Sequence, residues 1–262
     1  MDFSKYSKLA FSLDGKILTV TFNDPDRLNP LDAQAEKELC DFLHEGWSDP
    51  SFNVVILTGA GRAFSAGGDI GFMEEVMNDP SLFGVGQAKR TVLAMIDFPK
   101  PVIAKVNGHA VGLGATIALL CDVVFAATNA TFSDAHTRIG FAAGDGGAII
   151  WPLLVGYARA KEYLMTGDSI SATEAERIGL INHVVPAEEL DERVNAFAQR
   201  LSSGATKSID WTKQLINIGL RQQAASMLDA CVAYEAMSNI TKDHIEGVRA
   251  LKERRKPRFT GE

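Results

Sequence analysis

The sequence has 262 residues, and its 33 acidic and 26 basic side chains give a formal net charge of −7. Apolar residues make up 46% and charged residues 23%, as in an ordinary globular chain, which excludes a disordered, collagen-like or coiled-coil protein. The acidic balance argues against nucleic acid as a partner, because recognition of a phosphate backbone depends on clustered Lys and Arg.

Three cysteines are present, and they are Cys40, Cys121 and Cys231. They are odd in number and lack His or Cys neighbours at ligand spacing, so we expect neither disulfides nor a metal site, and a reducing, cytoplasmic location. Residues 1–6 lack the pattern of a signal peptide. The longest apolar run, 110–127, contains Asp122 and two glycines, and we interpret it as a buried helix followed by a buried strand, with no membrane contact.

The chain begins with a β-hairpin, whose turn is Asp14-Gly15. The segments predicted to be strands are 9–13, 17–22, 54–58, 102–106, 123–126 and 182–185. The segments predicted to be helices are 31–47, 70–77, 115–121, 147–155, 158–165, 172–178, 187–202 and 206–218, with further helix to about residue 251. Buried strands alternating with helices indicate an α/β fold with crossover connections, in which residues 1–200 form the core and residues 201–262 a helical C-terminal region.

Two segments share a layout that suggests ligand binding. The strand 54–58 leads into Ser65-Ala66-Gly67-Gly68-Asp69, and the strand 102–106 leads into Gly112-Leu113-Gly114. Glycines at such junctions let a ligand approach the backbone, and free N–H groups at a helix start point toward negative charge. Two of them converging on one point would form an oxyanion hole. The pattern alone is equally consistent with tight packing turns.

Segments spread over nearly the whole chain resemble one family. These segments are 62–70, 100–108 with Gly112 and Gly114, Cys121-Asp122, 164–172, 178–181, 246–247 and 252–259. In that order they resemble the crotonase (enoyl-CoA hydratase/isomerase) superfamily. The resemblance implies a spiral of ββα units with a C-terminal helical trimerisation region, a homotrimer or homohexamer, and acyl-CoA substrates. Coenzyme A would then be part of the substrate, and no separate cofactor is expected.

The resemblance also implies the positions of the site residues. The thioester carbonyl, and the enolate formed from it, would be held by the backbone N–H groups of Ser65 and of Leu113 or Gly114. The residues expected to contact coenzyme A are Arg27, Ala63, Ser65, Asp69, Ile70 and Gly112, with Lys256 and Phe259 reaching in from a neighbouring subunit.

The chain departs from the hydratases at both acid–base positions. Typical hydratases of the family use two glutamates, and the matching positions here hold Thr116 and His136. Threonine is no carboxylate base at neutral pH, so ordinary two-glutamate hydration is in doubt. His136 with Asp145 could replace the glutamates, because a histidine near its ordinary pKa is a competent base that a carboxylate can orient. This pair resembles the diketone-cleaving, oxocamphor hydrolase-like branch.

Other interpretations of these residues remain open. Asp145 could cap the helix that begins near Gly146, and it could do so while also acting in catalysis. Asp134 could contact His136 or the substrate, His109 is interpreted as a structural residue on a loop, and Trp151 as a core residue.

Three activities are consistent with these residues. The first is an acyl-CoA-processing enzyme of the hydratase/isomerase type, a lyase or isomerase. The second is a CoA-linked β-diketone or ring C–C hydrolase that uses His136 and Asp145. The third is a non-catalytic acyl-CoA-binding protein. A serine hydrolase is disfavoured because Ser65 lies well beyond its strand, and a dinucleotide-binding site because Gly59-Ala60-Gly61 lacks its third glycine.

Overall fold

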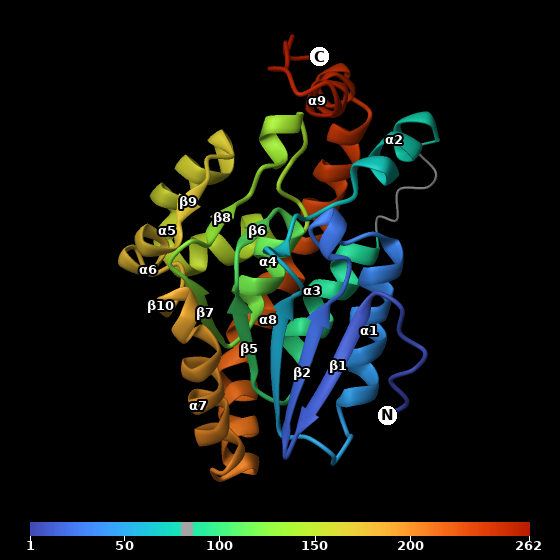
Figure 1. Ribbon diagram of the computed structural model, residues 1–262. Coiled ribbons are helices and arrows are strands. Elements are labelled where there is room, and N and C mark those ends of the chain that lie inside the picture. Colours follow the sequence, from blue (N-terminus) through green and yellow to red (C-terminus); the bar gives the residue numbers. More distant parts are fainter. Residues whose placement is uncertain (80–85) are drawn as a thin grey trace.

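We analysed a computed structural model of the chain, which describes residues 1–79 and 86–262. Its larger sheet has the strand order β1-β2-β3-β5-β7-β10. These strands are β1 (Leu9–Asp14), β2 (Ile17–Phe22), β3 (Val54–Gly59), β5 (Val102–Val106), β7 (Val123–Ala127) and β10 (His183–Val185). Strands β1 and β2 form an antiparallel hairpin, and every later neighbour pairs in parallel (Figure 1).

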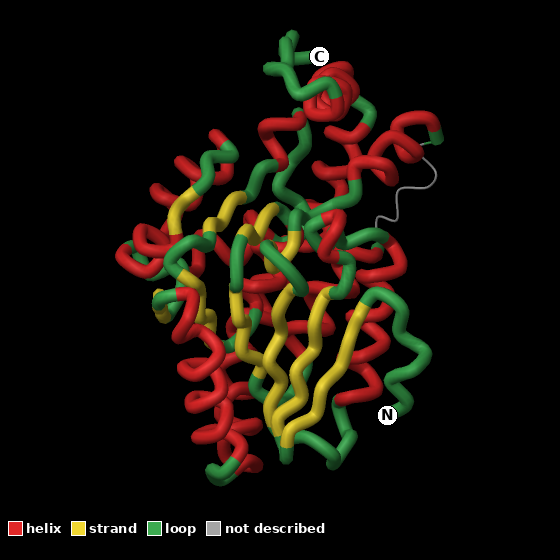
Figure 2. The backbone as a smooth tube through the Cα atoms, viewed as in Figure 1, coloured by secondary structure: helices red, strands yellow, loops and turns green. Residues whose placement is uncertain are grey.

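A smaller sheet has the order β4-β6-β8-β9. Its strands are β4 (Ala63–Ser65), β6 (His109–Val111), β8 (Thr131–Ser133) and β9 (Ile170–Ser171). Each of β3, β5 and β7 in the larger sheet is followed by one strand of the smaller sheet and then by helix. The chain is therefore a spiral of ββα units, as the α/β fold expected from the sequence implies (Figure 2).

Helices cover both faces of the larger sheet. They are α1 (Ala33–Gly46), α2 (Ile70–Asn78), α3 (Gln87–Asp97), α4 (Leu113–Leu120), α5 (Gly147–Thr166), α6 (Ala172–Arg177), α7 (Leu190–Ser202), α8 (Thr206–Asn239) and α9 (Lys242–Lys252), with 3-10 turns η1 (Pro25–Arg27), η3 (His136–Ile139) and η4 (Ala187–Glu189). No helix among the described residues combines the length and apolarity needed to cross a bilayer.

Alternating side chains divide the core between the two faces of the sheet. Val55 and Leu57 of β3 point into the main core with residues of α1, α3 and α4, whereas Val54 and Ile56 pack against α7. This alternation follows from the period of two in a strand. Trp151 is fully buried in the main core, as expected from the sequence.

Several element boundaries differ from the sequence predictions. The helix predicted over 31–47 begins at Ala33, because the Asp32 side chain accepts a hydrogen bond from the Ala35 N–H and caps it. The predicted helix 206–218 is only the first part of the 34-residue α8. The two helices predicted within 147–165 are joined in α5 across a kink at Gly156, whose φ of 78° is non-helical.

The structure adds elements that the sequence did not indicate. The short strands of the smaller sheet and helix α3 are absent from the predictions. His109, expected on a loop, is the first residue of β6, and its Nδ1 lies 2.8 Å from the Thr131 Oγ1 of β8. The run 110–127 does contain a buried helix, α4, followed by a buried strand, β7.

Candidate active site

Two adjoining hollows lie where strands β4 and β6 of the smaller sheet lead into helices α2 and α4. The first, which we call the α8 cavity, has a volume of about 310 Å³ and reaches Val232, Glu235 and Asn239 of α8. The second, the α9 groove, has a volume of about 690 Å³ and reaches Gly247 and Leu251 of α9. The residues that line both are Gly68, Asp69, Met73 and His136. A ligand could therefore lie in the groove and extend into the cavity.

Backbone from the two predicted ligand-binding segments meets at this junction. Gly68 and Leu113 both line the α8 cavity. Leu113 is the first residue of α4, and N–H groups in the first turn of a helix have no intrahelical acceptor. The two N–H groups before Gly68 already have acceptors within the protein: the Ala66 N–H donates to the Leu28 carbonyl at 2.9 Å and the Gly67 N–H to the Ser65 hydroxyl at 3.1 Å.

Two glycines are required for this backbone arrangement. Gly67 has a φ of +81°, and a Cβ there would lie 2.5 Å from the Val111 carbonyl oxygen. Gly112 has φ and ψ of 52° and −126°, a conformation that side chains disfavour. Its N–H donates to the Ser133 carbonyl at 2.8 Å, and its own carbonyl accepts the Thr116 N–H at 3.0 Å. The smaller sheet thus fixes the start of α4.

The structure places Ser65 and Ala63 away from the ligand surface. Both are fully buried in β4 and line neither hollow. The Ser65 hydroxyl donates to the Asn29 carbonyl at 2.8 Å, which gives it a structural role. Gly68, exposed and three residues further along, lines both hollows.

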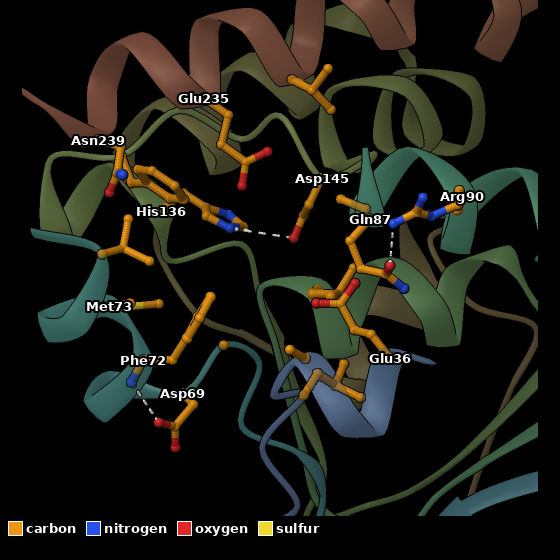
Figure 3. Close-up of a pocket in the computed structure, with 18 of the residues that line it drawn as sticks. Glu36, Asp69, Phe72, Met73, Gln87, Arg90, His136, Asp145, Glu235 and Asn239 are labelled. Atoms are coloured by element: carbon orange, nitrogen blue, oxygen red, sulfur yellow. Dashed lines mark hydrogen bonds and ion pairs between the residues drawn. The ribbon is translucent and has the colours of Figure 1, made fainter. Parts of the chain in front are cut away.

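His136 lies between two buried carboxylates. Its Nδ1 is 2.5 Å from the Oδ1 of Asp134. Its Nε2 is 3.3 Å from the Oδ2 of Asp145 (Figure 3). Asp134 and Asp145 are only 1% and 2% exposed. The imidazole edge also faces Gly112, where an added Cβ would lie 3.4 Å from Cε1 of the ring. The structure thus brings together the two residues of the predicted dyad, and adds Asp134 as a third member.

One carboxylate oxygen of Asp145 accepts hydrogen bonds, and the other accepts none from the described residues. Its Oδ1 accepts hydrogen bonds from the Thr116 hydroxyl at 3.1 Å and from the Gly147 N–H at 3.3 Å. Asp145 therefore accepts the N–H of the first residue of α5, but the N-cap residue is Gly146, which makes no side-chain capping hydrogen bond. The Asp145 Oδ2 is buried and accepts no hydrogen bond from any described residue, because the 3.3 Å contact with His136 is an ion pair without hydrogen-bond alignment. A buried acceptor of this kind requires a partner, and a water or substrate group in the cavity can supply it.

Electrostatics keep His136 charged and Asp145 ionised. Burial lowers the pKa of His136, but the attraction of Asp134 and Asp145 outweighs it and leaves that pKa well above its usual value. Burial likewise raises the pKa of Asp145, and the charge of His136 with the Gly147 and Thr116 hydrogen bonds brings it below its usual value. The expectation that His136 titrates near its ordinary pKa is therefore wrong. At neutral pH the proton of this pair therefore lies on His136, and Asp145 is the ionised partner.

The same three side chains come within metal-ligand spacing, since their donor atoms lie within 4.8 Å of one another. The two ring nitrogens of His136, however, face different carboxylates. A protonated imidazole already supplies positive charge between them, so the arrangement suits proton transfer better than ion binding.

The expected coenzyme A contacts fall partly in the α9 groove. Arg27, Asp69, Ile70 and Gly112 line it. Lys256 and Phe259 do not, and both lie in the exposed C-terminal segment.

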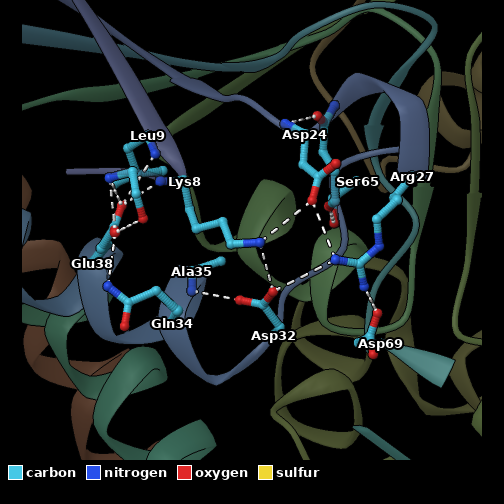
Figure 4. Close-up of polar contacts among 12 residues, drawn as sticks. Lys8, Leu9, Asp24, Arg27, Asp32, Gln34, Ala35, Glu38, Ser65 and Asp69 are labelled. Atoms are coloured by element: carbon cyan, nitrogen blue, oxygen red, sulfur yellow. Dashed lines mark hydrogen bonds and ion pairs between the residues drawn. The ribbon is translucent and has the colours of Figure 1, made fainter. Parts of the chain in front are cut away.

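Arg27 is engaged by acidic side chains (Figure 4). Its guanidinium forms an ion pair with Asp69 and lies 3.4 Å from Asp24. Asp69 also accepts the Phe72 N–H at 2.8 Å and so caps α2. A ligand phosphate at Arg27 would compete with Asp69 for the guanidinium.

Sequence reasoning missed two glutamates that line the α8 cavity. They are Glu36 of α1 and Glu235 of α8. Burial, with repulsion from Asp145, raises the pKa of Glu36 to about 7 and that of Glu235 to about 8. No motif surrounds either residue. The only signal in the sequence is the glycine-rich stretch 144–147, which permits the close approach of another element.

This combination of a ββα spiral, a backbone-lined junction and buried acid–base groups defines an α/β enzyme. A family model described as Enoyl-CoA hydratase/isomerase matches residues 13–262, and the chain belongs to that family.

Individual relatives agree with this assignment. The chain is 34% identical over 261 residues to crotonyl-CoA hydratase of Syntrophomonas wolfei subsp. wolfei, covering 97% of this chain and 98% of the relative. It is 33% identical over 256 residues to 1,2-epoxyphenylacetyl-CoA isomerase of Escherichia coli strain K12, covering 94% and 95%. A crystal structure of an enoyl-CoA hydratase/isomerase from Mycobacterium paratuberculosis matches with a TM-score of 0.88 and 35% identity, over 92% of this chain and 97% of the other.

Proposed function

We propose that this protein is an acyl-CoA lyase or isomerase of the enoyl-CoA hydratase/isomerase type, which stabilises a thioester enolate with the backbone N–H groups of Gly68 and Leu113 and uses Asp145 as its base. The single observation that carries the proposal is the buried Oδ2 of Asp145, which accepts no hydrogen bond from the described residues and lies 3.3 Å from His136 Nε2, in a cavity that Gly68 and Leu113 also line.

The arrangement of the two hollows supports the orientation of the substrate. The pantetheine arm and phosphates would occupy the α9 groove, which Arg27 lines. The thioester would lie at the Gly68–Leu113 junction, and the acyl chain would enter the α8 cavity, whose walls include Phe72, Val76 and Val232. The apolar walls favour the burial of a hydrocarbon chain.

The proposed chemistry assigns separate tasks to the backbone and to the buried charges. When water adds to the β-carbon of an enoyl thioester, Asp145 Oδ2 accepts the proton that the water loses. The double-bond electrons move toward the thioester, and the enolate oxygen is held by the two N–H groups. In an isomerisation Asp145 would accept a substrate proton instead. Charged His136 keeps Asp145 ionised throughout, so His136 acts through Asp145.

The test is turnover of crotonyl-CoA, followed by the loss of enoyl-thioester absorbance. We expect activity in the unmodified protein and a loss of about 100- to 10,000-fold in Asp145→Asn. A hydration rate that Asp145→Asn leaves unchanged would overturn the assignment of the base. Tight binding of butyryl-CoA without conversion of any enoyl-CoA would instead identify a binding protein.

A second candidate is the hydrolysis of a C–C bond in a CoA-linked β-diketone, because His136 and Asp145 form a contact pair. In that reaction Asp145 would activate water for attack on a ketone, and C–C cleavage would leave an enolate on the acyl-CoA. Release of a carboxylic acid from a β-diketone thioester, with no hydration of crotonyl-CoA, would favour this reaction.

We also propose a cytoplasmic homotrimer or homohexamer in which residues 201–262 mediate assembly. Helix α8 carries exposed apolar side chains that an interface could cover, namely Trp211, Leu215, Ile216, Ile218, Tyr234 and Met237. All three cysteines are free, as in a reducing compartment. Light scattering coupled to size exclusion measures the mass, and a monomer would contradict the proposal.

A further inference from the structure

We propose that Glu235 is a second acid–base residue of the α8 cavity, which donates the proton that the enolate α-carbon receives. This inference rests on the proposed function and adds a catalytic residue from a helix outside the ββα spiral.

The packing of α8 places this carboxyl group in the cavity. Glu235 lies against Gly144, where an added Cβ would be 2.6 Å from the Glu235 Cβ and 2.9 Å from its Oε2. The absence of a side chain at Gly144 therefore makes room for Glu235. The residue is only 6% exposed, and Figure 3 shows its carboxyl group directed toward the space between His136 and Asp145.

The charges around Glu235 favour its protonated form. Asp145 and Asp134 face it from the loops before α5 and η3, and Glu36 faces it from α1. His136 is the cation close to it, and that charge is already shared by two aspartates. Among the described residues, no Lys or Arg forms an ion pair with Glu235. Burial and the repulsion from Asp145 accordingly raise its pKa to about 8.

Two carboxyl groups at one cavity thus have opposite protonation states at neutral pH. Asp145 is ionised and can accept a proton, whereas Glu235 is protonated and can donate one. An environment that separates two pKa values in this way identifies the acid and the base of a reaction. The two family positions that hold Thr116 and His136 in this chain therefore need no glutamate, because Asp145 and Glu235 supply the same pair of functions.

The proton balance of the step is complete. Water gives its oxygen to the β-carbon and a proton to Asp145, and the enolate forms. The O–H bond of Glu235 then breaks as the new C–H bond forms at the α-carbon, which leaves Glu235 as a carboxylate. Transfer of the proton from Asp145 to Glu235, through solvent in the cavity, restores the starting state.

The test compares Glu235→Gln and Glu235→Asp with the matched control Asp229→Asn. Asp229 lies on the same helix, outside the cavity, and its ion pair with Lys89 is on the surface. Three quantities are measured for each variant: binding of butyryl-CoA by calorimetry, the hydration rate of crotonyl-CoA as a function of pH, and deuterium incorporation at the α-carbon of butyryl-CoA in heavy water.

We expect Glu235→Gln to bind butyryl-CoA with a Kd within about threefold of wild type, and to lose hydration and α-carbon exchange by about 100- to 10,000-fold. Wild-type activity should fall above pH 8, where Glu235 ionises, and Glu235→Asp should retain part of the rate with this alkaline limb displaced. Asp229→Asn should resemble wild type in all three measurements.

Each contrary result has a distinct meaning. If Glu235→Gln keeps the rate and the alkaline limb, Glu235 is not the donor and the proposed function stands. If Glu235→Gln loses binding but keeps kcat, Glu235 is a binding residue and the inference fails. A wild-type protein that binds butyryl-CoA but neither hydrates crotonyl-CoA nor exchanges the α-proton would overturn the proposed function and this inference together.

Discussion

Replacement of Gly112 by alanine should damage both stability and turnover, because this residue aims the first N–H groups of α4. Its φ of 52° and ψ of −126° lie in a region that costs a residue with a Cβ about 1–3 kcal/mol. The added Cβ would lie 3.4 Å from His136 Cε1 and 3.7 Å from its Nε2, which is ordinary contact. The loss should therefore come from the backbone and not from a clash.

If the backbone of Gly112→Ala relaxes toward a more favourable conformation, the Leu113 N–H turns away from the cavity. Loss of one oxyanion donor costs about 100- to 1,000-fold in rate, so kcat/KM for crotonyl-CoA should fall by about 10- to 1,000-fold. Urea denaturation measures the stability term. Gly15→Ala is the control, because Gly15 also has a positive φ and has no neighbour within 4 Å of its added Cβ. It should lose about 1–2 kcal/mol and keep its kcat/KM. A Gly112→Ala protein that loses stability but retains full kcat/KM would refute the role given to Gly112.

Three further predictions concern buried groups. The pKa of Glu235 is about 8 in the folded protein and about 4.5 in the unfolded chain, so the folded state of wild type loses stability as the pH rises between these two values. Glu235→Gln has no such group, so it should unfold with a free energy about 3–5 kcal/mol higher than wild type at pH 8–9, and the difference should vanish below pH 4.5. A urea midpoint of Glu235→Gln that equals that of wild type at pH 8–9 as well as below pH 4.5 would contradict this prediction. Asp134→Asn should destabilise the protonated form of His136 by about 1.5–3 kcal/mol, because a charged hydrogen bond is lost. NMR should then show a lower titration midpoint for the His136 imidazole, and an unchanged midpoint would mean that Asp145 alone stabilises the protonated ring. Trp151→Ala should cost about 3–5 kcal/mol by urea denaturation, since this fully buried side chain cannot be replaced by water, and a loss below 1 kcal/mol would show that the core collapses around the site.

The sequence predicted the parts of the site that depend on local backbone. Gly67, Gly112 and Leu113 lie on strand-to-helix connections, where the need for glycine is visible in the sequence itself. The dyad partners His136 and Asp145 also meet as predicted. The assignment of an N–H donor to Ser65 stays a prediction. The burial of its side chain was not foreseen, because the direction of side chains on a three-residue strand such as β4 cannot be read from so short a segment.

The remaining parts of the site depend on packing between distant segments. Glu235 enters the cavity because α8 crosses Gly144, a contact between positions 91 residues apart that no local pattern encodes. The charge state of His136 depends on the simultaneous burial of Asp134 and Asp145, and composition gives no measure of such burial. The smaller sheet was missed because its strands have two or three residues, too few for a periodic pattern.

Successive ββα units of the spiral contribute different residues to this site. The turn through β3 and β4 brings Gly68, and the turn through β5 and β6 brings Leu113. The turn through β7 and β8 brings Asp134 and His136, with Asp145 following on the connection to α5. The N–H donors that we propose thus belong to two ββα units, and the side chains to which we assign proton transfer belong to a third unit and to α8. If these assignments hold, substitutions in the third unit or in α8 should change the proton-transfer step and leave the binding of the thioester intact.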